Sequence, residues 1–287
     1  MATFAEVQQS LSLPLIAAPM TGVSGPELVI AACLAGIAGS FPTGNCRSIE
    51  DLDHWFSEIQ SKRAQARDEG KAAGSLSANI IIRGNKRIAE DITSIIRNNV
   101  DFVITSVGSP KDICGPLNDA GICVLADVAS MHHAERALEA GAGGLVLLSA
   151  GAGGHTGWAN GFAFVRAVRA MYDGPLVLAG GVSDGVALWG AQVLGYDLAY
   201  MGTRFIPTTE SMASPEWKQT LIDIEFDEIE VGIAANGVAA SMIKGGRGSA
   251  GHTVSAVKRI MSTREVVEET AREYAAARAA TLAALTT

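Results

Sequence analysis

Short apolar stretches alternate with amphipathic ones along most of the chain. Eight stretches rich in Val, Ile, Leu and Ala precede residue 205, and most of them are continuous apolar runs. Continuous runs are typical of strands that are buried on both faces of a parallel sheet. The predicted strands cover residues 13–19, 37–44, 75–81, 101–107, 122–128, 144–150, 175–181 and 198–204.

The segments between these strands have the pattern of helices. The predicted helices span residues 25–35, 48–70, 85–99, 131–141, 161–174 and 183–195, and several of them close on a glycine, as helix C-termini commonly do. We expect Ser48 and Ser183 to cap the two helices that they open. Between the fourth and fifth strands, Pro110 and Pro116 disfavour a continuous helix.

Eight strand–helix units in one chain favour a (β/α)8 TIM barrel. A doubly wound parallel sheet stays open as the alternative, because periodicity does not show whether the last strand pairs with the first. We expect one domain over residues 1–287, with the barrel at about 13–205. We interpret residues 206–287 as an elaboration that ends in a helix over 265–285, because they offer little core for a second domain.

Composition narrows the class of ligand. The chain has 287 residues, and its 30 acidic and 22 basic side chains leave a net charge of -8. This balance argues against binding to nucleic acid or to an anionic membrane and favours a small-molecule substrate. The four cysteines form no C-x-x-C pair and have no histidine at metal-ligand spacing, so we expect no metal site. No basic leader and no apolar run of roughly 20 residues is present, so we expect a cytoplasmic protein.

Glycines end the last two predicted strands. In barrels of this kind the site lies at the C-terminal ends of the strands, and the last two strands commonly hold a phosphate. Here they end in Gly180 and Gly181, and in Gly202 followed by Thr203. Bare glycine amides beside a threonine hydroxyl can donate to a phosphate. Glycine also makes ordinary turns, but two such ends on consecutive strands favour phosphate binding.

Three other side chains at strand ends are candidates for chemistry. Met20, which follows Pro19 after the first strand, can lie beside a flat ring. Asn79 is an amide in an otherwise apolar strand and therefore needs a partner. His155 lies in "GAGGHTG" after the sixth strand, where an imidazole can transfer a proton or donate to an oxyanion. The alternatives are a core methionine, an amide bonded to backbone, and a histidine bonded to its own loop.

In this order, "APMTGVSGPEL", "SANI", "TSVGSP", "GAGGHTG", "LAGGVSDG" and "YMGTRFIPTTES" resemble the nitronate monooxygenase family, which also includes flavin-dependent enoyl-ACP reductases. The resemblance extends from about residue 13 to the "SAGHTV" loop and implies a TIM barrel that binds FMN. It implies that the isoalloxazine contacts Ala18, Pro19 and Met20, that Asn79 hydrogen-bonds the flavin, and that Gly153 lies in the binding loop. It further implies that Gly180, Gly181, Met201, Gly202 and Thr203 bind the FMN phosphate and that His155 is the active-site histidine.

The sequence departs from the family pattern at three positions. Leu148 stands where the family typically has a glutamine or glutamate at the end of the sixth strand. Gly151 replaces a glutamate, and His252 replaces the glutamine of "SAGQ". These changes remove one expected flavin hydrogen bond and alter part of the substrate pocket.

The resemblance implies a reaction in which a nitronate is oxidised by O2 to a carbonyl compound and nitrite. One alternative is an FMN-dependent NAD(P)H reductase of an enoyl thioester or a quinone. A further alternative is a flavin-binding scaffold without turnover. The partners expected are thus a small-molecule substrate and either O2 or NAD(P)H, and glycine-rich loops around Trp158 are compatible with a lid or a homodimer contact.

Overall fold

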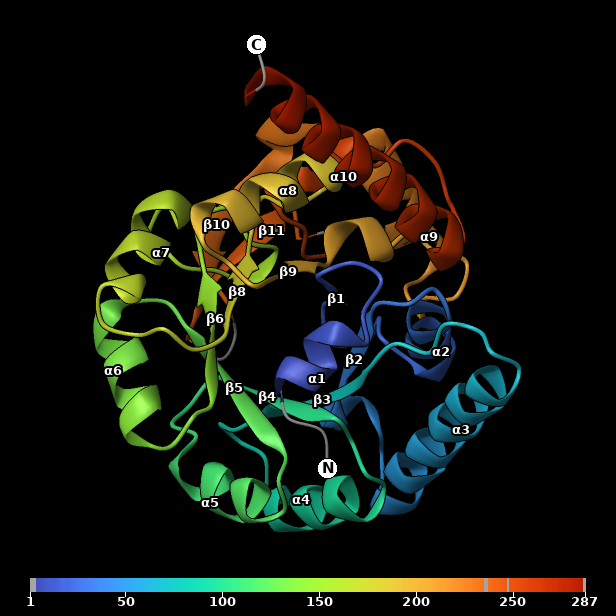
Figure 1. Ribbon diagram of the computed structural model, residues 1–287, viewed down its shortest axis with the longest axis vertical. Helices are drawn as coiled ribbons and strands as arrows, with labels where there is room; N and C mark the ends of the chain where they lie inside the picture. Colours follow the sequence, from blue (N-terminus) through green and yellow to red (C-terminus); the bar gives the residue numbers. More distant parts are fainter. Residues whose placement is uncertain (1–3, 235–236, 247, 286–287) are drawn as a thin grey trace.

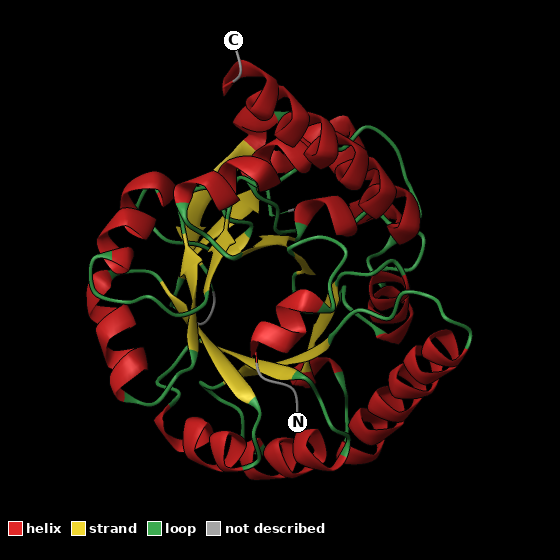
Figure 2. Cartoon of the chain, viewed as in Figure 1, coloured by secondary structure: helices red, strands yellow, loops and turns green. Residues whose placement is uncertain are grey.

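Eight parallel strands close into a barrel that is ringed by helices (Figures 1 and 2). The computed structural model describes residues 4–234, 237–246 and 248–285. The strand order is β1-β2-β3-β4-β5-β6-β8-β9, and β1 (Leu15–Ala17) pairs with β2 (Ala38–Pro42) on one side and with β9 (Leu198–Met201) on the other. The predicted TIM barrel is therefore confirmed, and the doubly wound alternative is wrong.

All eight barrel strands lie within the predicted segments. Besides β1, β2 and β9, the other five are β3 (Leu76–Ile81), β4 (Phe102–Ser106), β5 (Cys123–Val128), β6 (Gly144–Leu148) and β8 (Leu176–Ala179). Each is shorter than predicted, because the predicted segments also took in the turns at the strand ends. The strands alternate between a cluster inside the barrel and a larger cluster under the helices. On β5, for example, Leu125 packs inside the barrel whereas Val124 and Ala126 pack under the helices.

The barrel helices follow the predicted positions, and one more forms where prolines argued against it. They are α2 (Pro26–Leu34), α3 (Ile49–Asp68), α4 (Ile88–Arg97), α5 (Lys111–Asp119), α6 (Met131–Glu139), α7 (Gly161–Arg169) and α8 (Gly185–Leu194). Pro116 lies inside α5 and removes one backbone donor. The helix persists because Ile113, Cys114 and Leu117 are buried beneath it, and burial outweighs the missing hydrogen bond.

One of the two predicted helix caps is correct. Ser48 caps α3, with its hydroxyl accepting from the Asp51 amide at 3.1 Å. The prediction for Ser183 is wrong, because Asp184 caps α8 by accepting from the Ala187 amide at 2.8 Å. Aspartate and serine are about equally good at this position, so the sequence did not separate the two neighbours.

The C-terminal helix α10 (Thr263–Leu285) lies along α8 on the outside of the barrel (Figure 1). A Cβ on Gly185, at the start of α8, would lie 2.0 Å from the Tyr274 amide nitrogen. The glycine therefore permits the backbones of the two helices to touch. None of the helices in the described part of the chain is both long and apolar enough to cross a membrane.

Two features of the fold are absent from the sequence analysis. The first is α1 (Phe4–Gln9), which lies across the N-terminal opening of the barrel (Figure 1). Its Phe4 ring packs edge-on against Phe102 at the start of β4, with centroids 5.8 Å apart. The second is a small sheet of three short strands, β7 (Gly154–His155), β10 (Ile229–Ile233) and β11 (Ala239–Ile243), in the order β10-β11-β7. The segment between β9 and β10 includes α9 (Pro215–Asp223).

Candidate active site

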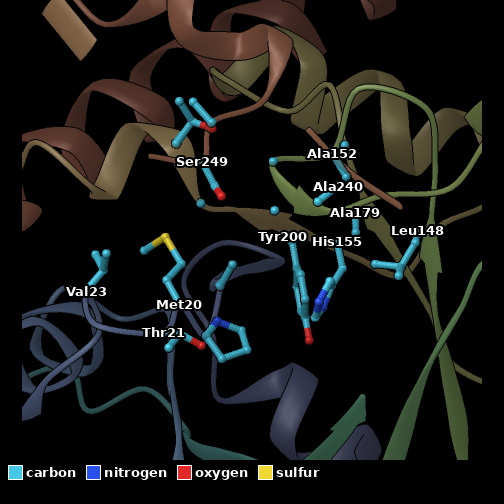
Figure 3. Close-up of a pocket in the computed structure, with 18 of the residues that line it drawn as sticks. Met20, Thr21, Val23, Leu148, Ala152, His155, Ala179, Tyr200, Ala240 and Ser249 are labelled. Carbon is cyan, nitrogen blue, oxygen red and sulfur yellow. The ribbon is translucent and has the colours of Figure 1, made fainter. Parts of the chain in front are cut away.

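A cavity of about 300 Å³ opens at the C-terminal ends of the barrel strands (Figure 3). With α1 over the opposite end, this is the face where barrels of this type carry their sites. Of the predicted site residues, those that line the cavity are Ala18, Pro19, Met20, Asn79, Gly153, His155, Gly180, Gly181, Gly202 and Thr203. The fold thus brings into one cavity residues that are scattered over most of the chain.

Met201 is the predicted site residue that does not line the cavity. Its side chain is fully buried in the cluster between the barrel and the helices. Its carbonyl accepts from the Ala18 amide at 3.0 Å. Met201 therefore holds the end of β1 in place, and its side chain is not positioned to touch a ligand.

The turn after β1 is held by two polar side chains. The Met20 amide donates to Ser24 Oγ at 3.0 Å, and this hydroxyl donates in turn to the Ala18 carbonyl. Asn45 Nδ2 donates to the carbonyls of Met20 and Ser24 at 3.1 and 2.8 Å. These bonds fix the turn that presents Pro19 and Met20 to the cavity. The sequence offered no signal for Asn45, which acts from the turn after β2.

The ends of β8 and β9 form a cradle of backbone groups. Gly181 has a φ of +79°, and a Cβ placed on it would meet no atom within 4 Å, so this face of the backbone is open. The Thr203 hydroxyl accepts from the Gly251 amide at 3.0 Å, which ties the cradle to the later glycine-rich loop. The N-terminus of α8 follows directly. Such a cradle of amides at a helix start suits an anion such as a phosphate.

His155 is fixed by pairing with a distant part of the chain. In β7, His155 and Gly154 pair antiparallel with Ala240 and Ser241 of β11. The next amide, that of Thr156, donates to the Ala239 carbonyl at 3.1 Å. Figure 3 shows the His155 ring extending into the cavity. The sequence predicts that His155 lies in a loop, and pairing with β11 of the β10–β11 hairpin gives this part of the loop a defined register.

Gly153 shows why the loop before His155 is rich in glycine. A Cβ on Gly153 would lie 2.6 Å from the Gly251 amide nitrogen and 3.3 Å from Thr203 Oγ1. The two glycine-rich loops therefore touch through their backbones, beside the cradle at the end of β9. A larger residue at this position would separate them.

The Asn79 amide is expected either to bond within the protein or to face a ligand, and its position is compatible with both. Its Nδ2 donates to the Ile104 carbonyl at 3.3 Å and to Ser106 Oγ at 3.2 Å. The side chain is therefore anchored to β4, and it also lines the cavity.

Two of the three departures from the family pattern, Gly151 and His252, are in contact with each other. Leu148 and Gly151 line the cavity, whereas His252 does not. A Cβ on Gly151 would lie 2.9 Å from His252 Nδ1, and the His252 ring stacks on Phe226 with centroids 4.6 Å apart. The His252 imidazole thus occupies space that a side chain at position 151 would need. Leu148 and Gly151 thus contribute no polar side-chain group to the cavity.

Two acidic side chains that the sequence analysis did not single out also line the cavity. Asp127 lies on β5 and Tyr200 on β9. Burial raises the pKa of Asp127 to about 8. Burial, and secondarily the nearby Asp127, raise the pKa of Tyr200 well above its ordinary value. Like Asn79, Asp127 is a polar residue in an otherwise apolar predicted strand. The same reasoning could therefore have identified Asp127 from the sequence.

Metal-ligating groups do not gather in the described residues. No three His, Cys, Asp or Glu side chains there lie close enough to hold an ion. The four cysteines are free thiols, and burial raises the pKa of Cys33 to about 11 and that of Cys46 to about 12. Thiols of this kind are poor nucleophiles and poor metal ligands at neutral pH.

The chain matches known proteins over most of its length. The family model described as nitronate monooxygenase matches residues 5–246. A nitronate monooxygenase from Paraburkholderia phytofirmans is 26% identical over 246 residues, which cover 73% of this chain and 67% of that protein. A 5-hydroxy-7a-methyl-1-oxo-octahydro-1H-indene-4-carboxyl-CoA dehydrogenase from Rhodococcus jostii is 27% identical over 69% of this chain. The match spans only 53% of the Rhodococcus protein's length. The solved structure of FabK from Thermotoga maritima has a similar fold, with a TM-score of 0.83. Its sequence is 22% identical to this one, and the match covers 100% of this chain and 99% of that chain.

Proposed function

This chain belongs to the nitronate monooxygenase family, and on this premise we propose that it is an FMN-dependent oxidoreductase that oxidises alkyl nitronates with O2. The products are a carbonyl compound and nitrite. The observation that carries the proposal is the single cavity that joins the turn after β1, the glycine cradle of β8 and β9, and His155.

The residues present fit a flavin mononucleotide. Gly181 has an open backbone face, and a Cβ on Gly202 would lie only at ordinary contact distance from Met20 Sδ, at 3.5 Å. The amides of this cradle and the Thr203 hydroxyl would hold the phosphate. Pro19 and Met20 would lie against the ring, and Asn79 would face its polar edge. FMN supplies the redox chemistry when it is bound, and the protein supplies orientation and electrostatics.

In this proposal His155 handles the charge and the protons of the substrate. Its pairing with β11 fixes the backbone from which the imidazole reaches into the cavity. An imidazole there can donate a hydrogen bond to the nitro oxygens of an anionic nitronate. With a neutral nitroalkane it can accept the α-proton instead. The apolar side chain of Leu148 lines the cavity and suits the alkyl part of the substrate.

The test begins with the visible spectrum of the purified protein. We then add propionate 3-nitronate, NADH or NADPH without oxygen. The proposal expects the nitronate to bleach the flavin absorption and the pyridine nucleotides to leave it unchanged on the same timescale. A colourless protein that FMN does not reconstitute would contradict the flavoenzyme proposal as a whole.

A second candidate function is that of an FMN-dependent NAD(P)H reductase of an enoyl thioester or quinone. The departures from the family pattern at Leu148 and Gly151 favour it, because they alter the part of the cavity that would receive a nitronate. The Rhodococcus relative, whose name denotes a carboxyl-CoA dehydrogenase, points in the same direction. Fast anaerobic bleaching by NADH or NADPH would establish this candidate over the monooxygenase. A scaffold without turnover would show neither response.

A further inference from the structure

Asp127 occupies the inward-facing position at the C-terminal end of β5. Along this strand, Leu125 belongs to the cluster inside the barrel and Cys123 packs against that cluster. Because side chains alternate along a strand, Asp127 is the next to point inward. It lines the cavity together with His155 and Gly153.

The Asp127 carboxyl has a hydrogen-bonding capacity that the protein leaves unused. Its Oδ1 atom is inaccessible to solvent and has no hydrogen-bond partner among the described residues. The same holds for the hydroxyl of Tyr200, which lines the same cavity. Buried polar groups are nearly always paired, and because the Asp127 side chain as a whole is only half-buried and lines the cavity, a ligand there can reach the carboxyl group and supply a partner.

The surroundings keep this carboxyl protonated at neutral pH. The cavity lining contains no lysine or arginine among the described residues, so no cation offsets the burial that raises the pKa of Asp127 to about 8. The nearby titratable side chain is Tyr200 of β9, whose pKa Asp127 helps to raise, and His155 of β7 lines the same cavity. The adjacent strands contribute Ser106 and Leu148, which do not titrate. At pH 7 the carboxyl is therefore mainly a neutral hydrogen-bond donor.

Asp127 also continues a polar strip that begins at Asn79. Asn79 Nδ2 donates to Ser106 Oγ at 3.2 Å on the neighbouring strand. Thr105 of β4 lies opposite Ala126 of β5, so the next pair along these parallel strands is Ser106 and Asp127. A flat ring that meets Asn79 at one point of the floor can extend along this strip to Asp127.

We propose that Asp127, as a neutral acid, donates a hydrogen bond to the flavin ring from the floor of the barrel. This inference rests on the proposed flavin-dependent function. It gives the cofactor a polar partner on β5 in place of the glutamine or glutamate that the family carries where Leu148 stands on β6. The two strands are neighbours, with Asp127 opposite Val146, so the polar group is moved by one strand.

The test measures FMN affinity of the apoprotein by quenching of flavin fluorescence at pH 7 and pH 9. Ionisation of Asp127 between these values removes the donor, so wild-type affinity should fall about tenfold at pH 9. The Asp127→Asn variant keeps a donor that does not ionise. It should bind FMN equally well at both pH values, within about threefold of wild type at pH 7. Asp127→Leu should bind about tenfold more weakly at both.

The controls separate this inference from the function on which it rests. Any ionisation of FMN itself affects wild type and Asp127→Asn alike, so their difference reports on Asp127. His155→Gln should retain the tenfold pH effect, and losing it there would assign the effect to His155 and overturn the inference. Equal pH dependence of FMN affinity in wild type and Asp127→Asn would also overturn the inference. This comparison is sufficient by itself if Asp127→Leu does not fold. Failure of wild type to bind FMN at either pH would overturn the proposed function itself.

Discussion

His155 of β7 lies opposite Ala240 of β11 in an antiparallel pair, so the candidate active-site histidine is positioned by a hairpin from the C-terminal third of the chain. The hairpin belongs to no βα unit of the barrel. It converts a glycine-rich loop into a strand of defined register. A side chain on such a strand is held more precisely than one on a free loop.

The first prediction concerns His155 itself. We expect His155→Gln to lower kcat/KM for a nitronate about 10²-fold, because the imidazole handles the substrate's charge or proton. FMN content should stay unchanged, since the cradle lies on β8 and β9. Steady-state kinetics measures kcat/KM, and the ratio of flavin absorbance to protein absorbance measures FMN content. His133→Gln, on the exposed face of α6, is the control and should leave both values unaltered; full activity of His155→Gln would contradict the assignment.

The second prediction concerns the phosphate cradle. A Cβ on Gly202 would lie 3.5 Å from Met20 Sδ and 3.6 Å from Ala18 Cβ, which are ordinary contacts. We therefore expect Gly202→Ala to fold normally, while its methyl group crowds the cradle and weakens FMN binding at least about tenfold. Riboflavin, which has no phosphate, should be affected less. Fluorescence titrations with the two flavins make the comparison.

The matched control for that variant is Gly190→Ala. Gly190 lies in α8, and a Cβ there meets no atom within 4 Å. This change should leave FMN affinity unaltered and raise stability by up to about 1 kcal/mol, because alanine favours a helix more than glycine does. Equal FMN affinity of Gly202→Ala and Gly190→Ala would rule out phosphate contact at Gly202.

The third prediction concerns stability and pH. Burial raises the pKa of Asp127 to about 8 in the folded protein, whereas the ordinary value for aspartate is about 3.9. Between these values the folded state holds a proton that the unfolded state has lost. Asp127 therefore lowers stability as pH rises through this window, by about 2 kcal/mol from pH 5.5 to pH 7.

Asp127→Asn lacks this titration. In the apoprotein, the Tm of Asp127→Asn minus the Tm of wild type should increase by roughly 4 °C between pH 5.5 and pH 7. This gap should stop widening above pH 8. Thermal unfolding followed by circular dichroism measures the gap. A gap that does not depend on pH would show that Asp127 titrates at its ordinary value in the folded protein.

The fourth prediction concerns an ion pair under the barrel wall. The Arg63 guanidinium is buried and pairs with Asp101, and its Nε donates to the Gly74 carbonyl at 2.8 Å. We expect Arg63→Leu to lower the free energy of unfolding by about 3 kcal/mol, because it leaves a carboxylate without its partner. Urea unfolding gives the value. The exposed pair of Lys71 and Glu69 is the control, and Lys71→Ala should change stability by less than about 0.5 kcal/mol.

Much of this architecture is determined locally and could be predicted from the sequence. The eight strands appear as continuous apolar runs because each is buried on both faces, and this requirement acts within a few residues. The glycines at the ends of β8 and β9, the amide of Asn79 and the position of His155 after β6 are local features of the same kind. They indicated the end of the barrel at which the cavity opens.

The tertiary structure decided what depends on contacts between distant residues. Whether β9 pairs with β1, whether Met201 faces a ligand or the core, and whether His252 fills the space beside Gly151 are settled by packing. The hairpin that holds His155 and the cavity that surrounds Asp127 arise in the same way. The physical reason is that periodicity records which side of a segment is buried, whereas the partner that buries it is chosen by the shape of the whole fold.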